Sequence, residues 1–165
     1  MKRVLLDTNI YGLLIVDPMR KSLKEKLIES NEYVVYGLSI IRKELRDTPR
    51  DILGPDGKLR IFLLQMYDDI TKLRSLETTR AMEDLAQAYY LAYREFGGLS
   101  AHQEIIKDFI IVACSSARSM DIIVSHDQRT MLSPAALKAY ALVNKIKKLA
   151  VPRFINYENF KKELR

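Results

Sequence analysis

The chain has 165 residues, of which 48% are hydrophobic and 29% are charged, and its formal net charge is +6. This composition excludes a disordered chain, and the length favours a single domain, residues 1–165, with a substantial core. The single cysteine, Cys114, excludes a disulfide framework, and two histidines make a structural zinc site unexpected. No apolar stretch approaches the roughly 18 residues of a membrane helix, so we expect a soluble, cytoplasmic protein with no membrane partner.

Hydrophobic patterning and turn residues predict strands that alternate with helices. In chain order we expect a strand over 3–6, helices over Thr8–Val16 and 19–30, a strand over 33–36, a turn at Gly37, a helix over 39–47 capped by Ser39, a loop over 50–58, helices over 59–74, 79–96 and 101–119, a strand over 121–125, a helix over 135–149, a strand over 153–156 and a helix over 157–164. This alternation indicates an α/β fold with a central parallel sheet of four to five strands and helices on both faces.

Four acidic residues stand out by their positions in this pattern. Asp7 and Asp127 follow predicted strands, and ligands gather beyond the carboxyl ends of parallel strands. Glu44 lies on the helix after the second strand, and Asp108 lies beside the apolar face of the helix over 101–119. A carboxylate in that position is costly unless it is paired or binds a cation. Taken singly, the other three have ordinary explanations as a helix cap, a turn residue and a surface ion pair.

Taken together, the four acids favour a metal site. Crowded carboxylates repel one another unless a cation neutralises them, and Mg²⁺ prefers carboxylate oxygens and substrate phosphate. A metal ion held in this way can activate water and stabilise charge on a phosphodiester. Because the chain is otherwise basic, a phosphate-bearing substrate is expected.

The segments around these acids resemble the PIN-domain nucleases, a family that includes the VapC-type toxins of toxin–antitoxin pairs. The segments are Leu5-Leu6-Asp7-Thr8-Asn9-Ile10, Ile41-Arg42-Lys43-Glu44-Leu45, Asp108-Phe109-Ile110-Ile111-Val112-Ala113 and Ile123-Val124-Ser125-His126-Asp127. The resemblance implies a PIN-like fold, RNA hydrolysis dependent on Mg²⁺ or Mn²⁺, and an antitoxin as partner if the chain is a toxin. It implies an acidic quartet of Asp7, Glu44, Asp108 and Asp127, with Asn9 and Ser125 ordering the pocket. The segments 54–98 and 130–150 look longer than in a compact toxin, which leaves the toxin role open.

Other side chains suggest contacts with partners. Arg42, Arg129 and Arg153 are candidate substrate-binding residues, because arginine suits bidentate phosphate contacts; the alternative for each is a solvated basic surface. Aromatic residues on the helix over 79–96 predict a helix interface or a homodimer interface, and we expect a homodimer. These are Tyr89, Tyr90, Tyr93 and Phe96.

Two other functions compete with the nuclease. The first is a catalytically inactive, RNA-binding or regulatory PIN-like module, which cleavage assays would distinguish from an enzyme. The second is a haloacid-dehalogenase-like phosphatase, a class with an Asp-x-Asp motif after the first strand. This chain has Asp7-Thr8-Asn9 there and lacks the second carboxylate, so the phosphatase is disfavoured.

Overall fold

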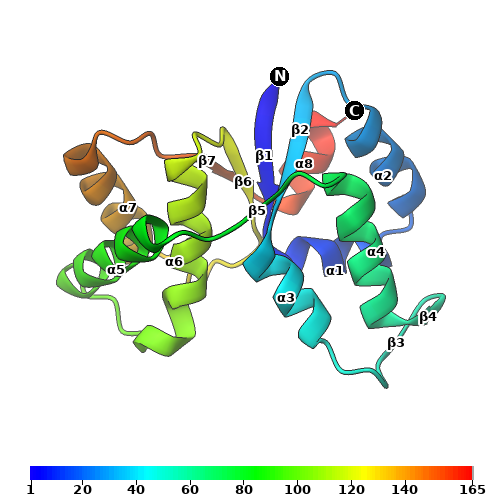
Figure 1. Ribbon diagram of the computed structural model, residues 1–165, viewed down its shortest axis with the longest axis horizontal. Coiled ribbons are helices and arrows are strands. Elements are labelled where there is room, and N and C mark those ends of the chain that lie inside the picture. The colour runs from blue at the N-terminus through cyan, green and yellow to red at the C-terminus, as the bar shows by residue number, and fades with distance from the viewer. Residues whose placement is uncertain (165) are drawn as a thin grey trace.

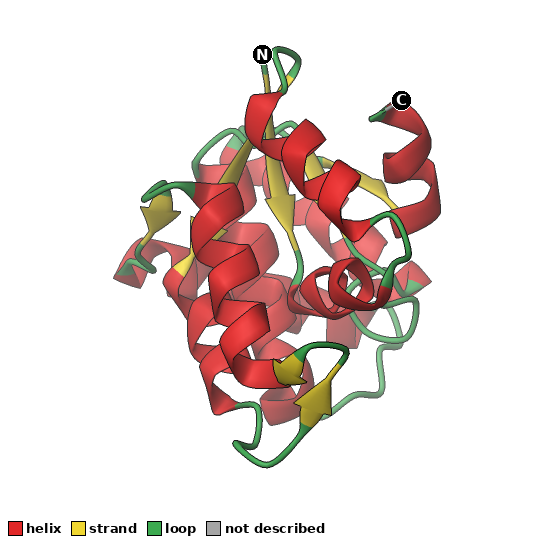
Figure 2. Cartoon of the chain, turned by 90° about the vertical axis from the view of Figure 1, so that its right-hand side faces the viewer, coloured by secondary structure: helices red, strands yellow, loops and turns green. Residues whose placement is uncertain are grey.

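The computed structural model describes residues 1–164, and its centre is a sheet of five parallel strands in the order β5-β2-β1-β6-β7. The strands are β1 (Lys2–Leu6), β2 (Tyr33–Leu38), β5 (Ser75–Leu76), β6 (Ile122–Val124) and β7 (Arg153–Ile155). The predicted α/β fold with a parallel sheet is therefore confirmed. Within the expected loop, β3 (Leu53–Gly54) and β4 (Gly57–Lys58) form a small antiparallel hairpin, which stands apart from the main sheet (Figures 1 and 2).

Two groups of helices flank the strands. The helices are α1 (Thr8–Val16), α2 (Arg20–Glu29), α3 (Ser39–Asp47), α4 (Leu59–Thr71), α5 (Arg80–Glu95), α6 (His102–Ala117), α7 (Pro134–Lys147) and α8 (Tyr157–Glu163). Figure 1 shows α5, α6 and α7 together on one side of the strands and α1 to α4 on the other. Among residues 1–164, no helix combines the length and apolar character needed to cross a membrane.

The central strands are buried because they are apolar on both faces. Val4, Leu5 and Leu6 of β1 are fully inaccessible to solvent, and their partners in β6 are almost equally buried. Strands that are covered on both faces need apolar residues at successive positions, as these runs have. The chain leaves this core at the carboxyl ends of β1 and β6, where the candidate acids follow.

The structure differs from the sequence predictions around the end of β2. Gly37 does not turn the chain but lies within β2, beside Ser75 of β5. Ser39 begins α3 without capping it, since Leu38 occupies the cap position and no side chain bonds to the helix start. The two-residue strand β5 was not predicted, because its pairing comes from the neighbouring strand rather than from its own pattern.

The aromatic face of α5 packs inside the chain. Tyr89 and Tyr93 are buried, with ring centroids 6.3 Å and 5.5 Å from Phe109 of α6. Phe96 remains partly exposed at the end of the helix. The prediction of a helix interface therefore describes the two buried tyrosines, which supply no surface for a second copy of the chain.

Candidate acidic site

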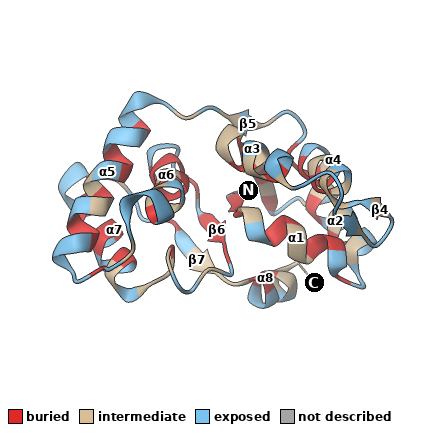
Figure 3. Cartoon of the chain, turned by 90° about the horizontal axis from the view of Figure 1, so that it is seen from below, coloured by how far each residue is buried: buried red, intermediate tan, exposed pale blue. Residues whose placement is uncertain are grey.

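The four predicted acids come from four separate segments that meet at the carboxyl end of the sheet. Asp7 directly follows β1, Asp127 lies three residues beyond β6, and α3 and α6 carry Glu44 and Asp108. Figure 3 looks onto this end and places α1 and α3 on one side of it and α6 on the other. The acids affect one another electrostatically: burial first, then repulsion by the other three, raises the pKa of Asp108 to about 7.

Asp7 is the most enclosed of the four acids. Its Oδ1 accepts a bond of 2.7 Å from the Thr8 backbone N–H at the start of α1, so it is a helix cap. Its Oδ2 accepts bonds of 2.7 Å from both the Asn9 amide and the Ser125 hydroxyl. Burial raises the pKa of Asp7, although these hydrogen bonds favour the charged form. Both predicted supporting residues therefore contact the same carboxylate oxygen.

Asp127 and Asp108 share one hydroxyl group. Thr130 Oγ1 lies 2.5 Å from Asp108 Oδ2 and also contacts Asp127 Oδ2. A hydroxyl carries a single proton, so it can donate to only one of these oxygens at a time. Burial raises the pKa of Asp127, but bonds from the Thr130 side chain and the Arg129 and Thr130 backbone N–H groups outweigh it, and the net pKa is lowered. With its pKa near 7, Asp108 is the member that takes a proton.

Glu44 joins the cluster from α3. Its Oε2 accepts a hydrogen bond of 2.5 Å from the Thr8 hydroxyl, and its Oε1 lies 3.4 Å from Lys107 Nζ on α6. Glu44 therefore does make an ion pair, and its partner lies on α6. Hydroxyls and backbone N–H groups connect the four acids in one continuous chain. That chain runs Glu44, Thr8, Asp7, Ser125, Asp127, Thr130 and Asp108.

The donor set fits a hard divalent cation by its chemistry. All four groups are carboxylates, and the repulsion at Asp108 is the kind that a cation relieves. Within residues 1–164, no three His, Cys, Asp or Glu side chains are already arranged as ligands. Mg²⁺ keeps several waters and takes one or two protein carboxylates, so the cluster does not need a preformed cage.

The three predicted substrate-binding arginines lie in different surroundings. Arg129 is next to the acids, where its backbone N–H bonds to Asp127 Oδ1 at 2.9 Å. Arg42 makes a bidentate pair with Asp68 of α4, with both N–O distances 2.9 Å. Arg153 is not brought to the acids: it begins β7 at the opposite end of the sheet and pairs with Glu163.

A groove of about 580 Å³ runs beside α3. Lys43 and Arg46 line it together with Ile110 of α6, and no carboxylate among residues 1–164 forms an ion pair with either cation. Glu77 and Glu83 also line the groove, so its charge is mixed. Lys43 directly precedes Glu44 on α3, but none of the four acids lines the groove.

Comparisons with known proteins identify the fold. No protein-family model matches the sequence, and no curated protein matches it. The structure is similar to a chain of VapBC2 from Rickettsia felis bound to a promoter DNA fragment, with a TM-score of 0.60, 13% identity and coverage of 94% of this chain and 98% of the other. It is similar to FitAB bound to an IR36 DNA fragment, with a TM-score of 0.59, 18% identity and coverage of 93% and 94%. For FitAcB from Neisseria gonorrhoeae the TM-score is 0.57, the identity 21% and the coverage 81% and 92%. The chain therefore has a PIN-like fold, as its motifs predicted.

Three residues of the network were not predicted from the sequence. Thr8 connects Glu44 and Asp7 through its hydroxyl and its backbone N–H, Thr130 contacts Asp108 and Asp127 through its hydroxyl, and Lys107 forms an ion pair with Glu44. Both threonines lie within three residues of a predicted acid, where short hydroxyl side chains often bond locally. Lys107 offers no such signal, because its contact with Glu44 spans 63 positions of the chain.

Proposed function

We propose that the protein is a metal-dependent endoribonuclease that hydrolyses RNA phosphodiester bonds at the acidic cluster. The observation that carries this proposal is the convergence of four carboxylates from four segments, with the pKa of Asp108 raised to about 7 by burial and by the other three acids. A structural network would be expected to pair buried acids with cations, whereas the only ion pair that these four acids make among residues 1–164 is that of Glu44 with Lys107.

Asp7, Asp108, Asp127 and Glu44 would hold Mg²⁺ or Mn²⁺, and the bound ion would activate water and stabilise charge on the phosphate. Asn9 and Ser125 would orient Asp7, since both donate to its Oδ2. Thr130 would keep Asp108 and Asp127 at a fixed separation by contacting both. Such supporting hydrogen bonds fix the direction of metal-ligating oxygens.

Cations on α3 would bind the RNA backbone on the approach to the acids. Lys43 and Arg46 line the groove that runs along α3, the helix of Glu44, without an ion pair among the described residues, and Arg129 bonds to Asp127 through its backbone N–H. We therefore place these three residues, rather than Arg153, in the proposed RNA-binding surface. Phosphate contacts of this kind make binding weaken as salt is added.

A toxin role is the biological setting that the fold supports best. The similar structures include VapBC2 and FitAB, each bound to DNA. We therefore propose an antitoxin protein as a partner of this chain, encoded beside it. Two observations would support that assignment: a neighbouring gene that encodes a small DNA-binding protein, and co-purification of that protein with this chain.

Cleavage of a labelled RNA panel in Mn²⁺ tests the enzymatic proposal. Asp7→Asn and Asp108→Asn should each lower the cleavage rate at least about 100-fold, because loss of a metal ligand removes several kcal/mol of transition-state stabilisation. RNA binding, measured separately by filter retention, should remain.

The matched control is Asp121→Asn, which neutralises a carboxylate at the other end of β6. It should cut RNA as well as the parent. If the parent binds RNA but never cuts it, the chain is a binding module; if both site variants cut at the parental rate, the acids are not the catalytic site.

A further inference from the structure

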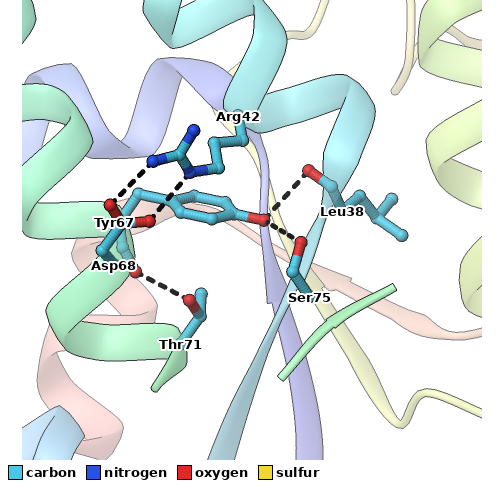
Figure 4. A network of polar contacts seen from close by, with 6 residues as sticks. All are labelled: Leu38, Arg42, Tyr67, Asp68, Thr71 and Ser75. Atoms are coloured by element: carbon cyan, nitrogen blue, oxygen red, sulfur yellow. Dashed lines mark hydrogen bonds and ion pairs between the residues drawn. The ribbon is translucent and has the colours of Figure 1, made fainter. Parts of the chain in front are cut away.

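Helix α4 holds α3 by two of its neighbouring residues, Tyr67 and Asp68 (Figure 4). The Tyr67 hydroxyl donates to the carbonyl oxygen of Leu38 at 3.0 Å and lies 2.8 Å from the hydroxyl of Ser75. The Asp68 carboxylate takes the bidentate bond from Arg42. Leu38 immediately precedes α3 and Arg42 lies in its first half, so α4 fixes both the start of the helix and its rotation.

Tyr67 packs so closely against β2 that no residue larger than glycine fits at position 37. A Cβ atom added to Gly37 would lie 2.1 Å from the Tyr67 hydroxyl oxygen, which is closer than any real contact. Tyr67 is only 1% exposed, and its ring centroid is 5.4 Å from that of Tyr11 on α1. Tyr67 therefore contacts both α1, which carries Thr8, and the residue before α3, the helix that carries Glu44.

The Arg42–Asp68 pair lies at the surface, unlike the buried contacts of Tyr67. Its two side chains are 41% and 50% exposed, and ion pairs so exposed contribute little to global stability. A bidentate pair nevertheless imposes a specific geometry on its partners. Glu44 lies two residues after Arg42 on the same nine-residue helix, so a rotation of α3 would move Glu44 away from the Thr8 hydroxyl.

We infer that Tyr67, Asp68 and Arg42 are positioning residues that hold Glu44 in register with Asp7. In this arrangement Arg42 acts through its pair with Asp68 and does not bind RNA. The inference rests on the proposed function, because it assigns Glu44 to the metal-binding and RNA-cleaving cluster. The inference identifies residues outside the cluster whose substitution should weaken metal binding and cleavage by the cluster.

Two adjacent carboxylates on α4 provide a matched test. Asp68 pairs with Arg42 of α3, whereas Asp69 pairs with Lys24 of α2, a helix that carries none of the four acids. Asp68→Asn should lower kcat for RNA cleavage about 10-fold and leave KM within about twofold, as loss of an orienting contact does. Asp69→Asn should change neither. Equal behaviour of the two variants would overturn the inference.

A charge reversal separates positioning from RNA contact. Arg42→Asp alone should lower kcat, and the double variant Arg42→Asp with Asp68→Arg should recover much of it, because the ion pair is restored with opposite polarity. If Arg42 instead binds phosphate, KM should rise in Arg42→Asp and stay raised in the double variant. Asp68→Asn would then be silent, and the inference would be wrong.

Two further measurements test the positioning role without relying on RNA cleavage and show whether each variant is folded. Mn²⁺ affinity, measured by calorimetry without RNA, should fall about 10-fold in Asp68→Asn and in Tyr67→Phe and stay unchanged in Asp69→Asn. Urea unfolding of each variant reports whether it folds. Parental Mn²⁺ affinity and kcat in the folded Asp68 and Tyr67 variants would overturn the inference and leave the nuclease proposal intact. If the parent protein binds Mn²⁺ but cuts no RNA, the nuclease proposal is wrong. The Mn²⁺ affinities of the variants would still show whether Asp68 and Tyr67 position the acids.

Discussion

The two ends of the central sheet both carry acids, but the acids at the two ends have different partners. At the amino-terminal end, Asp121 accepts a bond of 2.6 Å from the backbone N–H of Arg3, and Glu163 makes a bidentate pair with Arg153. At the carboxyl-terminal end, Asp108 and Asp127 face each other across the hydroxyl of Thr130.

The difference is visible in the pKa values. Hydrogen bonds from Arg153 hold the pKa of Glu163 below its ordinary value, whereas burial and neighbouring acids raise the pKa of Asp108 to about 7. A lowered pKa means that the fold stabilises the charged carboxylate, and a raised pKa means that the fold opposes it. The amino-terminal end is therefore built for stability, and the carboxyl-terminal end retains a need for positive charge.

The largest expected effect is that of a divalent cation on stability. If the carboxyl-terminal end binds Mn²⁺, the ion should raise the unfolding free energy by about 2.7 kcal/mol at 100 times its Kd. Urea unfolding with and without Mn²⁺ measures this gain. Asp7→Asn and Asp108→Asn should abolish it, and Glu163→Gln, at the other end, should preserve it. Equal loss in all three variants would mean that the two ends do not differ.

A smaller effect is expected from Asp108→Asn in metal-free buffer. The folded protein keeps a proton on Asp108 up to about pH 7, whereas the unfolded chain loses it near pH 4, so parental stability falls as the pH rises between those values. The amide has no such cost, and the variant should be more stable than the parent by about 2 kcal/mol at pH 8, roughly half of what the full shift implies. Urea unfolding at pH 8 and pH 3.5 with a chelator checks the gain and its disappearance in acid. A loss of stability at pH 8 would show that the carboxylate is already neutralised within the chain.

The contrast between the ends explains which features were predictable from the sequence. Buried strands have an apolar pattern that needs no tertiary information, so β1 and β6 were predicted to within a residue or two, and with them the placement of Asp7 and Asp127. The four acids were assigned partly because a family pattern resembles them. The assignment of these acids to catalysis remains a prediction.

Contacts between distant segments were not predictable. Gly37 suggested a turn, but its missing side chain makes room for Tyr67 of α4, thirty positions along the chain. Arg42 and Arg153 were both candidates for RNA because arginine suits phosphate, and each forms an ion pair with a carboxylate that only the fold brings near. A pattern along the chain shows which residues are charged, but it does not show which charges are already paired.

The smallest expected effect comes from Glu163→Gln, the same carboxylate-to-amide change at the amino-terminal end. Here the variant should be less stable at pH 7, by about 0.5 kcal/mol, because the pair with Arg153 is partly exposed and solvent screens it. Since the folded pKa of Glu163 is lowered, this contribution is present above the pKa of the unfolded chain and disappears as the pH falls through the folded value. Urea unfolding at pH 7 and at successively lower pH should show the difference and then its decline. A variant more stable than the parent at pH 7 would contradict the contrast, because the same substitution would then act with one sign at both ends of the sheet.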